Sequence, residues 1–207
     1  MRGLKETAIG SMSKGAVVTQ FERSMAHYCQ SPYSSVFPLA RVALFYALRA
    51  LKLPRGSEVI LPPYTIADFI NVIYSLGLKP VFVDINLNTY SADSKLICEK
   101  ITEHSKVLLL THLFGVTPDM EEYVTLCAEN NLTLIEDVSQ NLGCTYKGEK
   151  LGSFGDLGII SLSSLKTCGT FFGGMVVTKH KQLLDEMNVL AKPELKKPCR
   201  SLFVKLI

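Results

Sequence analysis

The stretch EVILPPYTIADFINVIYSLGLKPVFVD, residues 58–84, contains a complete strand–helix–strand unit and decides the fold class. Its two ends, EVILP and PVFVD, are short apolar runs, which is typical of strands that are covered on both faces. Residues 67–76 between them predict a helix that Gly77 ends. Apolar strands that alternate with helices predict an α/β fold, in which a mostly parallel sheet carries helices on both faces.

The same alternation continues on both sides of this unit. Further helices are predicted at 20–30, 40–52, 93–102, 119–130 and 181–191, further strands at 106–111, 132–137, 157–161 and 175–178, and a small hairpin at 145–152. SPYSS, residues 31–35, is interpreted as a break. We therefore expect an N-terminal segment over 1–35, one large domain over 36–195, and the start of a C-terminal region over 196–207.

Composition excludes several classes of function. The 207 residues are 47% hydrophobic and 20% charged with a net charge of +3, and no Lys/Arg run indicates nucleic-acid binding. The six cysteines form no CxxC pair, which favours reduced thiols over a metal site. No signal peptide and no membrane span are found, so we expect a cytoplasmic location. Neither GxGxxG after a strand nor GxxxxGK[ST] occurs, which argues against a nucleotide-binding Rossmann protein.

Polar residues at strand ends are the candidates for a site, because ligands of such sheets bind outside the carboxyl ends of the strands. Asp137 ends the strand at 132–137 and Gln140 follows it, while Ser161 ends the strand at 157–161 and Lys166 comes five residues later. Each has an ordinary alternative. Asp137 is also a helix N-cap by type, Ser161 a turn serine, and Lys166 a solvated loop lysine.

The helix at 40–52 begins with Ala40 and Arg41. Free N–H groups and the helix dipole attract anions to such a helix start, and a cation there conflicts with the dipole. A bound phosphate would remove the conflict at Arg41. The alternative is an exposed arginine that has no partner.

One chemistry unites these residues. A lysine amine bonds covalently to a carbonyl cofactor. Pyridoxal phosphate also needs a carboxylate for its pyridine nitrogen and a site for its phosphate. Lys166, Asp137 and the pair Ser161 and Arg41 fit those three needs, so we predict pyridoxal 5'-phosphate as the cofactor.

Four segments carry a family resemblance. EVILPPYTIADFINVIYSLGLKPVFVDI, THLFGVTPDM, LIEDVSQNLGCTYKGEKLGSFGDLGIISLSSLK and GGMVVT resemble the DegT/DnrJ/EryC1/StrS family of pyridoxal-phosphate-dependent sugar aminotransferases. The resemblance covers roughly residues 20–195 and implies the large domain of the aspartate aminotransferase-like fold, fold type I. The site residues that it implies are Lys166, which holds the cofactor and moves the proton; Asp137, against the pyridine nitrogen; Gln140, against the ring; Ser161, on the phosphate; and Ala40 with Arg41, at the phosphate-binding turn.

The resemblance also implies substrates and partners. Such enzymes move an amino group from an amino acid, here expected to be glutamate, to a nucleotide-linked keto-sugar in polysaccharide or amino-sugar biosynthesis. They are homodimers whose active sites lie at the subunit interface. His112 and Asp119 are expected to shape their loop rather than to react.

The chain also departs from the family pattern. Ala40 replaces a common glycine, Ile66 stands where an aromatic residue usually stacks on the cofactor, and Thr167 and Phe172 replace common polar residues. Family members run about twice as far, with a small C-terminal domain for which these 207 residues leave no room. The alternative to an aminotransferase is therefore a truncated, non-catalytic remnant that binds cofactor or a partner subunit. In either case we expect poor turnover by the chain alone and a tendency to associate.

Overall fold

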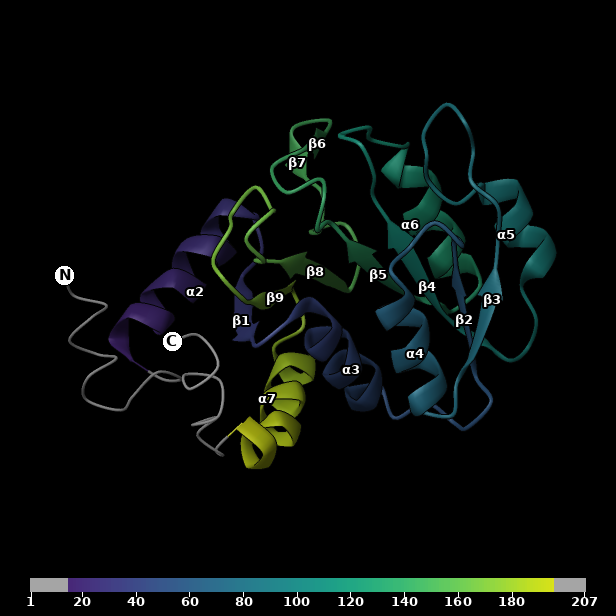
Figure 1. The fold of residues 1–207 in the computed structure, drawn as a ribbon. Helices are drawn as coiled ribbons and strands as arrows, with labels where there is room; N and C mark the ends of the chain where they lie inside the picture. The colour runs from purple at the N-terminus through teal and green to yellow at the C-terminus, as the bar shows by residue number, and fades with distance from the viewer. Residues whose placement is uncertain (1–14, 196–207) are drawn as a thin grey trace.

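The computed structural model describes residues 15–195, in which a seven-stranded sheet lies between two layers of helices (Figure 1). The predicted C-terminal region at 196–207 and the first 14 residues lie outside this range. The strands of the sheet are β1 (Tyr33–Phe37), β2 (Glu58–Leu61), β3 (Lys79–Phe82), β4 (Ser105–Thr111), β5 (Thr133–Asp137), β8 (Leu157–Ser161) and β9 (Gly174–Thr178). The helices are α2 (Ala16–Tyr28), α3 (Ala40–Ala50), α4 (Ala67–Ser75), α5 (Ser94–Lys100), α6 (Met120–Glu129) and α7 (Lys181–Leu195).

The strands follow the order β1-β9-β8-β5-β4-β2-β3 across the sheet. Neighbours from β8 through β5, β4 and β2 to β3 are parallel, and β9 runs antiparallel to both β1 and β8. The predicted mostly parallel α/β sheet is thus confirmed, with one reversed strand.

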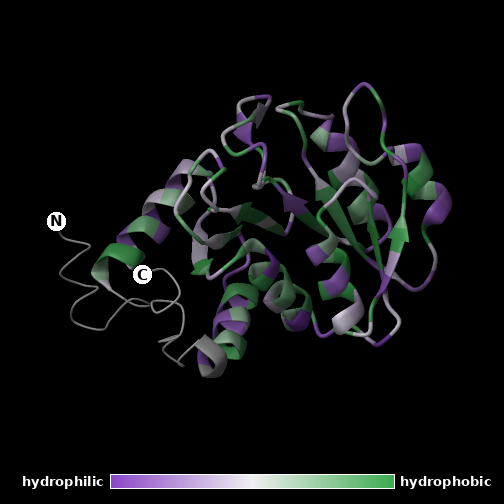
Figure 2. Cartoon of the chain, in the orientation of Figure 1, coloured by the Kyte–Doolittle hydropathy of each residue, from purple (hydrophilic) through white to green (hydrophobic). Residues whose placement is uncertain are grey.

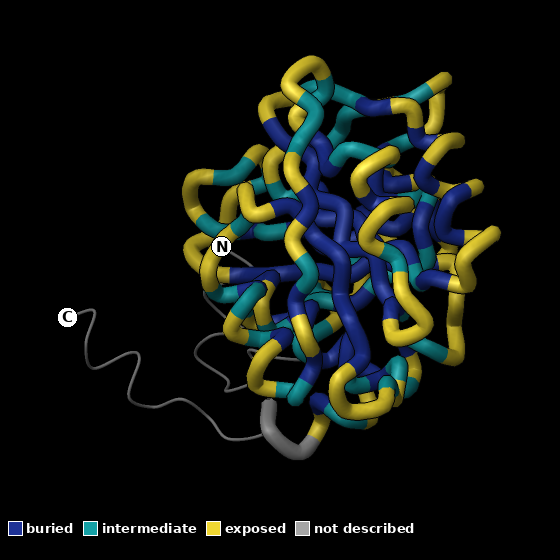
Figure 3. The backbone as a smooth tube through the Cα atoms, turned by 90° about the vertical axis from the view of Figure 1, so that its right-hand side faces the viewer, coloured by how far each residue is buried: buried dark blue, intermediate teal, exposed yellow. Residues whose placement is uncertain are grey.

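Each face of the sheet has its own apolar core. Helices α3, α4 and α7 pack on one face and α2, α5 and α6 on the other. Alternate strand residues serve the two cores, as Val59 and Ile60 do in β2, which explains why the strands read as continuous apolar runs. The strands are largely green in Figure 2 and dark blue in Figure 3, and exposed segments lie at the periphery.

Most predicted elements occur within a few residues of their expected ends, and the exception is the segment at 31–35. The prediction of a break there is wrong, because Tyr33–Phe37 forms β1 and pairs with β9, Tyr33 opposite Thr178. The hairpin is confirmed as β6 (Thr145–Tyr146) and β7 (Glu149–Lys150).

The topology places three strand ends at one edge. Thr111 at the end of β4 lies opposite Asp137 at the end of β5 in the parallel ladder, and Ser161 ends β8 at the same edge. Since β8 and β9 are antiparallel neighbours, the loop that joins them returns to this edge and carries Lys166 with it. Gly174, where β9 begins, touches the start of α3. A Cβ there would clash with the carbonyl carbon of Leu39.

Candidate active site

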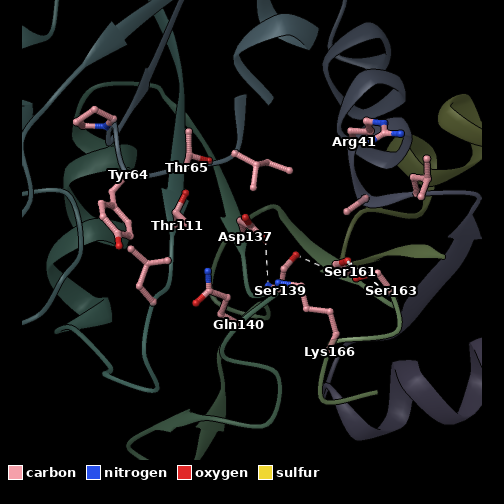
Figure 4. A pocket seen from close by; sticks show the side chains of 15 residues that line it. Arg41, Tyr64, Thr65, Thr111, Asp137, Ser139, Gln140, Ser161, Ser163 and Lys166 are labelled. Atoms are coloured by element: carbon pink, nitrogen blue, oxygen red, sulfur yellow. Dashed lines mark hydrogen bonds between the residues drawn. The ribbon is translucent and has the colours of Figure 1, made fainter. Parts of the chain in front are cut away.

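A cavity of about 520 Å³ opens at this edge of the sheet. This volume falls in the range of small-molecule and cofactor sites. All of the predicted site residues line it, from four separate parts of the chain: Ala40 and Arg41, Asp137 and Gln140, Ser161, and Lys166. Figure 4 shows Asp137 near the centre, with Lys166 reaching toward it from the loop between β8 and β9.

Asp137 is a buried carboxylate at the cavity wall, with 7% of its surface exposed. The backbone N–H of Ser139 donates to Asp137 Oδ1 at 3.0 Å, which closes a turn and not a helix, so the N-cap alternative is wrong. Burial raises the pKa of the Asp137 carboxyl, whereas hydrogen bonds from Ser139 and the charges of His112 and Lys166 lower it. A carboxylate in this position favours a cationic group in the cavity.

Lys166 and Ser161 belong to one hydrogen-bonded loop. The Ser161 hydroxyl donates to the Ser163 hydroxyl at 3.3 Å, and the backbone N–H of Lys166 donates to the Ser163 carbonyl at 3.0 Å. Lys166 is half-buried and lines the cavity, so the alternative of a fully solvated lysine is wrong. Its amine therefore lies in the same space as the Asp137 carboxylate.

The start of α3 forms another wall of the cavity. Leu39, Ala40 and Arg41 line the cavity, and no side chain caps this helix, so its first backbone N–H groups are available to an anion. The alternative of an Arg41 without a partner is wrong, because its guanidinium pairs with Asp68 Oδ2 at 2.5 Å. Asp68 lies in the first turn of α4, where the helix dipole favours an acidic side chain.

A buried hydrogen bond between a histidine and a glutamate lies behind the cavity wall. His112 Nε2 lies 3.1 Å from Glu136 Oε2, and neither side chain is exposed. Glu136 also accepts hydrogen bonds from the backbone N–H groups of Gly152 and Gly155, each at 2.8 Å. His112 thus contacts the carboxylate that holds the loop at Gly152 and Gly155, and its expected role in its own loop stays a prediction. Asp119 likewise caps α6 by accepting from the N–H of Glu121.

Sequence reasoning missed four polar residues that line the cavity: Thr65, Thr111, Ser139 and Ser163. Thr111 was detectable, because it is the last residue of an apolar strand that neighbours the strand of Asp137. Ser139 stands between two predicted site residues. Thr65 and Ser163 lie in loops, where the pattern of apolar residues carries no signal.

Two of these residues indicate whether the cavity suits a polar cofactor. The Thr65 and Thr111 hydroxyl oxygens are buried and have no hydrogen-bond partner in the protein. An unsatisfied buried hydroxyl is costly, and both residues line the cavity. Together with the Asp137 carboxylate, the Lys166 amine and the uncapped start of α3, they suit a ligand that carries a cationic ring nitrogen, a carbonyl group and an anion. Pyridoxal phosphate meets this description.

Solved structures with this fold are pyridoxal-phosphate aminotransferases, so the described residues form the large domain of that class. One of them, the NtdA protein of Bacillus subtilis "with bound cofactor pmp", is 28% identical, has a TM-score of 0.83 and aligns over 91% of this chain and 42% of its own. The DegT/DnrJ/EryC1/StrS aminotransferase family model matches residues 4–204. The chain belongs to this family, whose enzymes use pyridoxal phosphate.

Two curated relatives act on nucleotide-linked sugars by name. GDP-perosamine synthase of Escherichia coli O157:H7 is 39% identical over 84% of this chain and 48% of its own length. The dTDP-3-amino-3,6-dideoxy-alpha-D-galactopyranose transaminase of Aneurinibacillus thermoaerophilus is 35% identical over 85% and 49%. The chain therefore spans about half the length of the curated relatives it matches. Among residues 15–195, no helix is long and apolar enough to cross a membrane.

Proposed function

We propose that this chain is the cofactor-binding part of an aminotransferase that transfers an amino group from an amino acid, glutamate in the first instance, to a nucleotide-linked keto-sugar. The observation that carries the proposal is the single cavity that holds Lys166, Asp137 and the uncapped start of α3. The names of the relatives support the substrate class.

The chain's own groups have distinct tasks in this proposal. Pyridoxal phosphate, when bound, supplies an aldehyde that bonds to amines and a ring that withdraws electrons from the carbon to be deprotonated. Lys166 Nζ would hold the cofactor and, when free, would accept and donate the proton that moves between neighbouring carbons. The Asp137 carboxylate keeps a proton on the pyridine nitrogen. Gln140, which lines the cavity, would lie against the ring.

The phosphate would bind at the start of α3. The backbone N–H groups of Ala40 and Arg41 are the donors that we assign to it, and the Ser161 hydroxyl would join them by turning its proton away from Ser163. The Arg41 guanidinium lies at the rim, where its charge is balanced by Asp68 in the cofactor-free protein, and it would contact the phosphate only by turning from this partner. Arg41→Ala should weaken pyridoxal phosphate binding more than pyridoxal binding, and Asp68→Asn, which leaves the arginine in place, should not. An equal effect of Arg41→Ala on both ligands would contradict the assignment.

The covalent assignment has a direct test. The protein is mixed with pyridoxal phosphate, reduced with borohydride and digested, and mass spectrometry locates the adduct. We expect the adduct on Lys166 and its loss in Lys166→Arg, whereas Lys95→Arg, on helix α5 and outside the cavity, should keep it. An adduct on another lysine, or none, would contradict the proposal.

The alternative of a non-catalytic remnant stays open to a second measurement. Addition of glutamate to the cofactor-loaded protein should convert the bound cofactor to its amine form, seen as a change in absorbance. Cofactor binding on Lys166 with no conversion would favour the remnant.

We also propose a homodimer, with the second copy covering the loop that carries Lys166. This loop exposes three large apolar side chains: Leu165, Phe171 and Phe172, which are 96%, 87% and 60% exposed. Exposed apolar clusters of this kind mark interaction surfaces. Analytical ultracentrifugation should find a dimer that Phe171→Ser weakens, and a monomer at all concentrations would contradict the proposal.

A further inference from the structure

Three loops at the carboxyl edge of the sheet carry aromatic rings that the proposed chemistry does not use. Tyr64 follows β2, Tyr90 follows β3 and Phe114 follows β4, and these three strands are parallel neighbours. The centroid of the Phe114 ring lies 5.8 Å from that of Tyr64 and 5.2 Å from that of Tyr90. These three residues form an aromatic cluster.

The aromatic cluster continues the wall of the cavity. Tyr64 lines the cavity, and Figure 4 shows it on the opposite side of Asp137 from Arg41. Tyr64, Tyr90 and Phe114 are 54%, 37% and 55% exposed. Both ring pairs meet edge to face, at 61° and 83°, and not as a flat stack. Ring surface therefore stays open to a planar ligand beside the cavity.

Two of the rings are held by backbone conformations that residues other than glycine rarely adopt. The φ angle is +58° at Phe114 and +54° at Tyr90. Such a conformation costs free energy that a glycine would avoid. Neither ring is buried, so burial offsets little of this cost. An aromatic residue kept at such a position favours a use of the ring outside the core.

A buried asparagine fixes the loop that carries Phe114. The backbone N–H of Gly115 donates to Asn141 Oδ1 at 3.1 Å, and Asn141 Nδ2 donates to the Val116 carbonyl at 2.9 Å. Asn141 directly follows Gln140, which lines the cavity. The loop of Phe114 is thus tied to the turn after β5, and a ligand would meet a ring whose position is already set.

We propose that the aromatic cluster is the subsite for the base of the nucleotide-linked sugar. The proposal rests on the proposed function, which gives such a sugar as the substrate. The end of the cavity at the start of α3 is assigned to the cofactor phosphate, so the rest of a long substrate lies toward the other end, where Tyr64 stands. Aromatic side chains bind bases by stacking, because every base has a flat π face.

Nucleoside diphosphates test the subsite. Titration calorimetry on the pyridoxal-phosphate-loaded chain compares guanosine diphosphate and thymidine diphosphate with inorganic pyrophosphate, which has no base. Both nucleotides should bind more tightly than pyrophosphate. Phe114→Gly, which removes the ring and suits the positive φ, should weaken both nucleotides about tenfold and leave pyrophosphate unchanged. Phe114→Tyr, which keeps a ring, should keep the nucleotide affinity.

Tyr74→Ala is the matched control, because Tyr74 is an exposed aromatic residue of α4 outside the cluster and the cavity. It should leave the affinity for all three ligands unchanged. Phe114→Gly should unfold at no lower temperature than the unmodified chain, so a lost fold would not explain its effect. Nucleotides that bind no better than pyrophosphate, or an equal loss of all three ligands in Phe114→Gly, would overturn the proposal.

A second copy of the chain is the other occupant to distinguish. Analytical ultracentrifugation of Phe114→Gly should show the same association as the unmodified chain. Lost association with unchanged nucleotide affinity would overturn the proposal and assign the cluster to a contact between copies. Base-dependent binding in a chain that takes no amino group from glutamate would support the aromatic cluster and refute the proposed transfer instead.

Discussion

Two buried carboxylates lie at opposite ends of the sheet, and their surroundings shift their pKa values in opposite directions. Glu58, at the amino end of β2, accepts from Lys79 Nζ at 2.9 Å, Thr102 Oγ1 at 2.6 Å and Ser105 Oγ at 2.9 Å. These hydrogen bonds, with that from Thr102 the largest, lower its pKa to about 2. Asp137, at the carboxyl end of β5, has its pKa raised by burial.

The difference separates the amino end of the sheet from the end that carries the candidate site. The amino end satisfies its buried polar groups within the protein. The carboxyl end leaves the Thr65 and Thr111 hydroxyls without partners and keeps a desolvated carboxylate. Buried polar groups without partners lower the free energy of unfolding of the cofactor-free protein. A ligand that hydrogen-bonds to them gains binding free energy.

Replacing each carboxylate with alanine should give the largest difference in the free energy of unfolding. Glu58→Ala should lower the free energy of unfolding by roughly 4 kcal/mol, because Lys79, Thr102 and Ser105 lose a common acceptor. Asp137→Ala should change it by less than about 1 kcal/mol, because the lost hydrogen bonds offset the relief of desolvation. Urea denaturation of the cofactor-free chain measures both, and equal losses would remove the distinction between the two ends.

Acid should distinguish the two carboxylates next. A folded pKa lowered from 4.5 to about 2 means that Glu58 stabilises the fold above its unfolded pKa and that this is lost as pH falls through about 2. The full contribution is on the order of 3 kcal/mol. Asp137 has the opposite sign, since its protonation relieves a desolvated charge. The free energy of unfolding, measured from pH 7 to pH 2, should therefore fall less with acid in Glu58→Gln than in the unmodified chain. It should fall more in Asp137→Asn. A parallel curve for Glu58→Gln would contradict the first assignment.

A glycine at each end extends the comparison. Gly174→Ala should destabilise by about 2 kcal/mol, because its Cβ would meet the backbone of Leu39 and Ala40, which cannot move cheaply. Gly56→Ala, near the amino end, meets nothing within 4 Å but has a φ of +85°, so it should cost about 1 kcal/mol. Only Gly174→Ala should also weaken pyridoxal phosphate binding. Equal effects on binding would show that the start of α3 does not shape the cavity.

The smallest predicted effects differ in sign. Thr111→Val removes a buried hydroxyl that has no partner, so it should stabilise the cofactor-free chain by about 1 kcal/mol. Thr102→Val removes a hydroxyl that donates to Glu58, so it should destabilise by a similar amount. Thermal unfolding of the two variants side by side checks the signs. Destabilisation by both would mean that Thr111 has a partner in solution.

The sequence predicted most of the fold because the strands are continuous apolar runs between glycine and proline. It failed at β1. This edge strand includes Ser34 and Ser35, and its only partner in the sheet, β9, lies at the far end of the described chain. Local pattern cannot signal a strand that is defined by such a distant pairing.

Most of the residues that line the candidate site were also predictable from the sequence. Spacing and resemblance identified residues that the structure brings into one cavity, although their roles stay predictions. The Arg41–Asp68 pair was not predictable, because it depends on how α3 lies beside α4. The hydrogen bond from the Ser161 backbone N–H to the Ser139 hydroxyl was also missed, since it requires the turn geometry after β5.

The pairing of β1 with β9 also sets an order of events during synthesis on the ribosome. β1 leaves the exit tunnel early, yet its partner strand is the last strand among the described residues 15–195. Until then the edge of β8 has no neighbour, and the start of α3 lacks the Gly174 contact that seats it. Non-local pairing of this kind slows folding and leaves an open strand edge exposed to other chains. The cavity can therefore form only after β9 has been made, and a ribosome that stalls before residue 174 would release a chain without it.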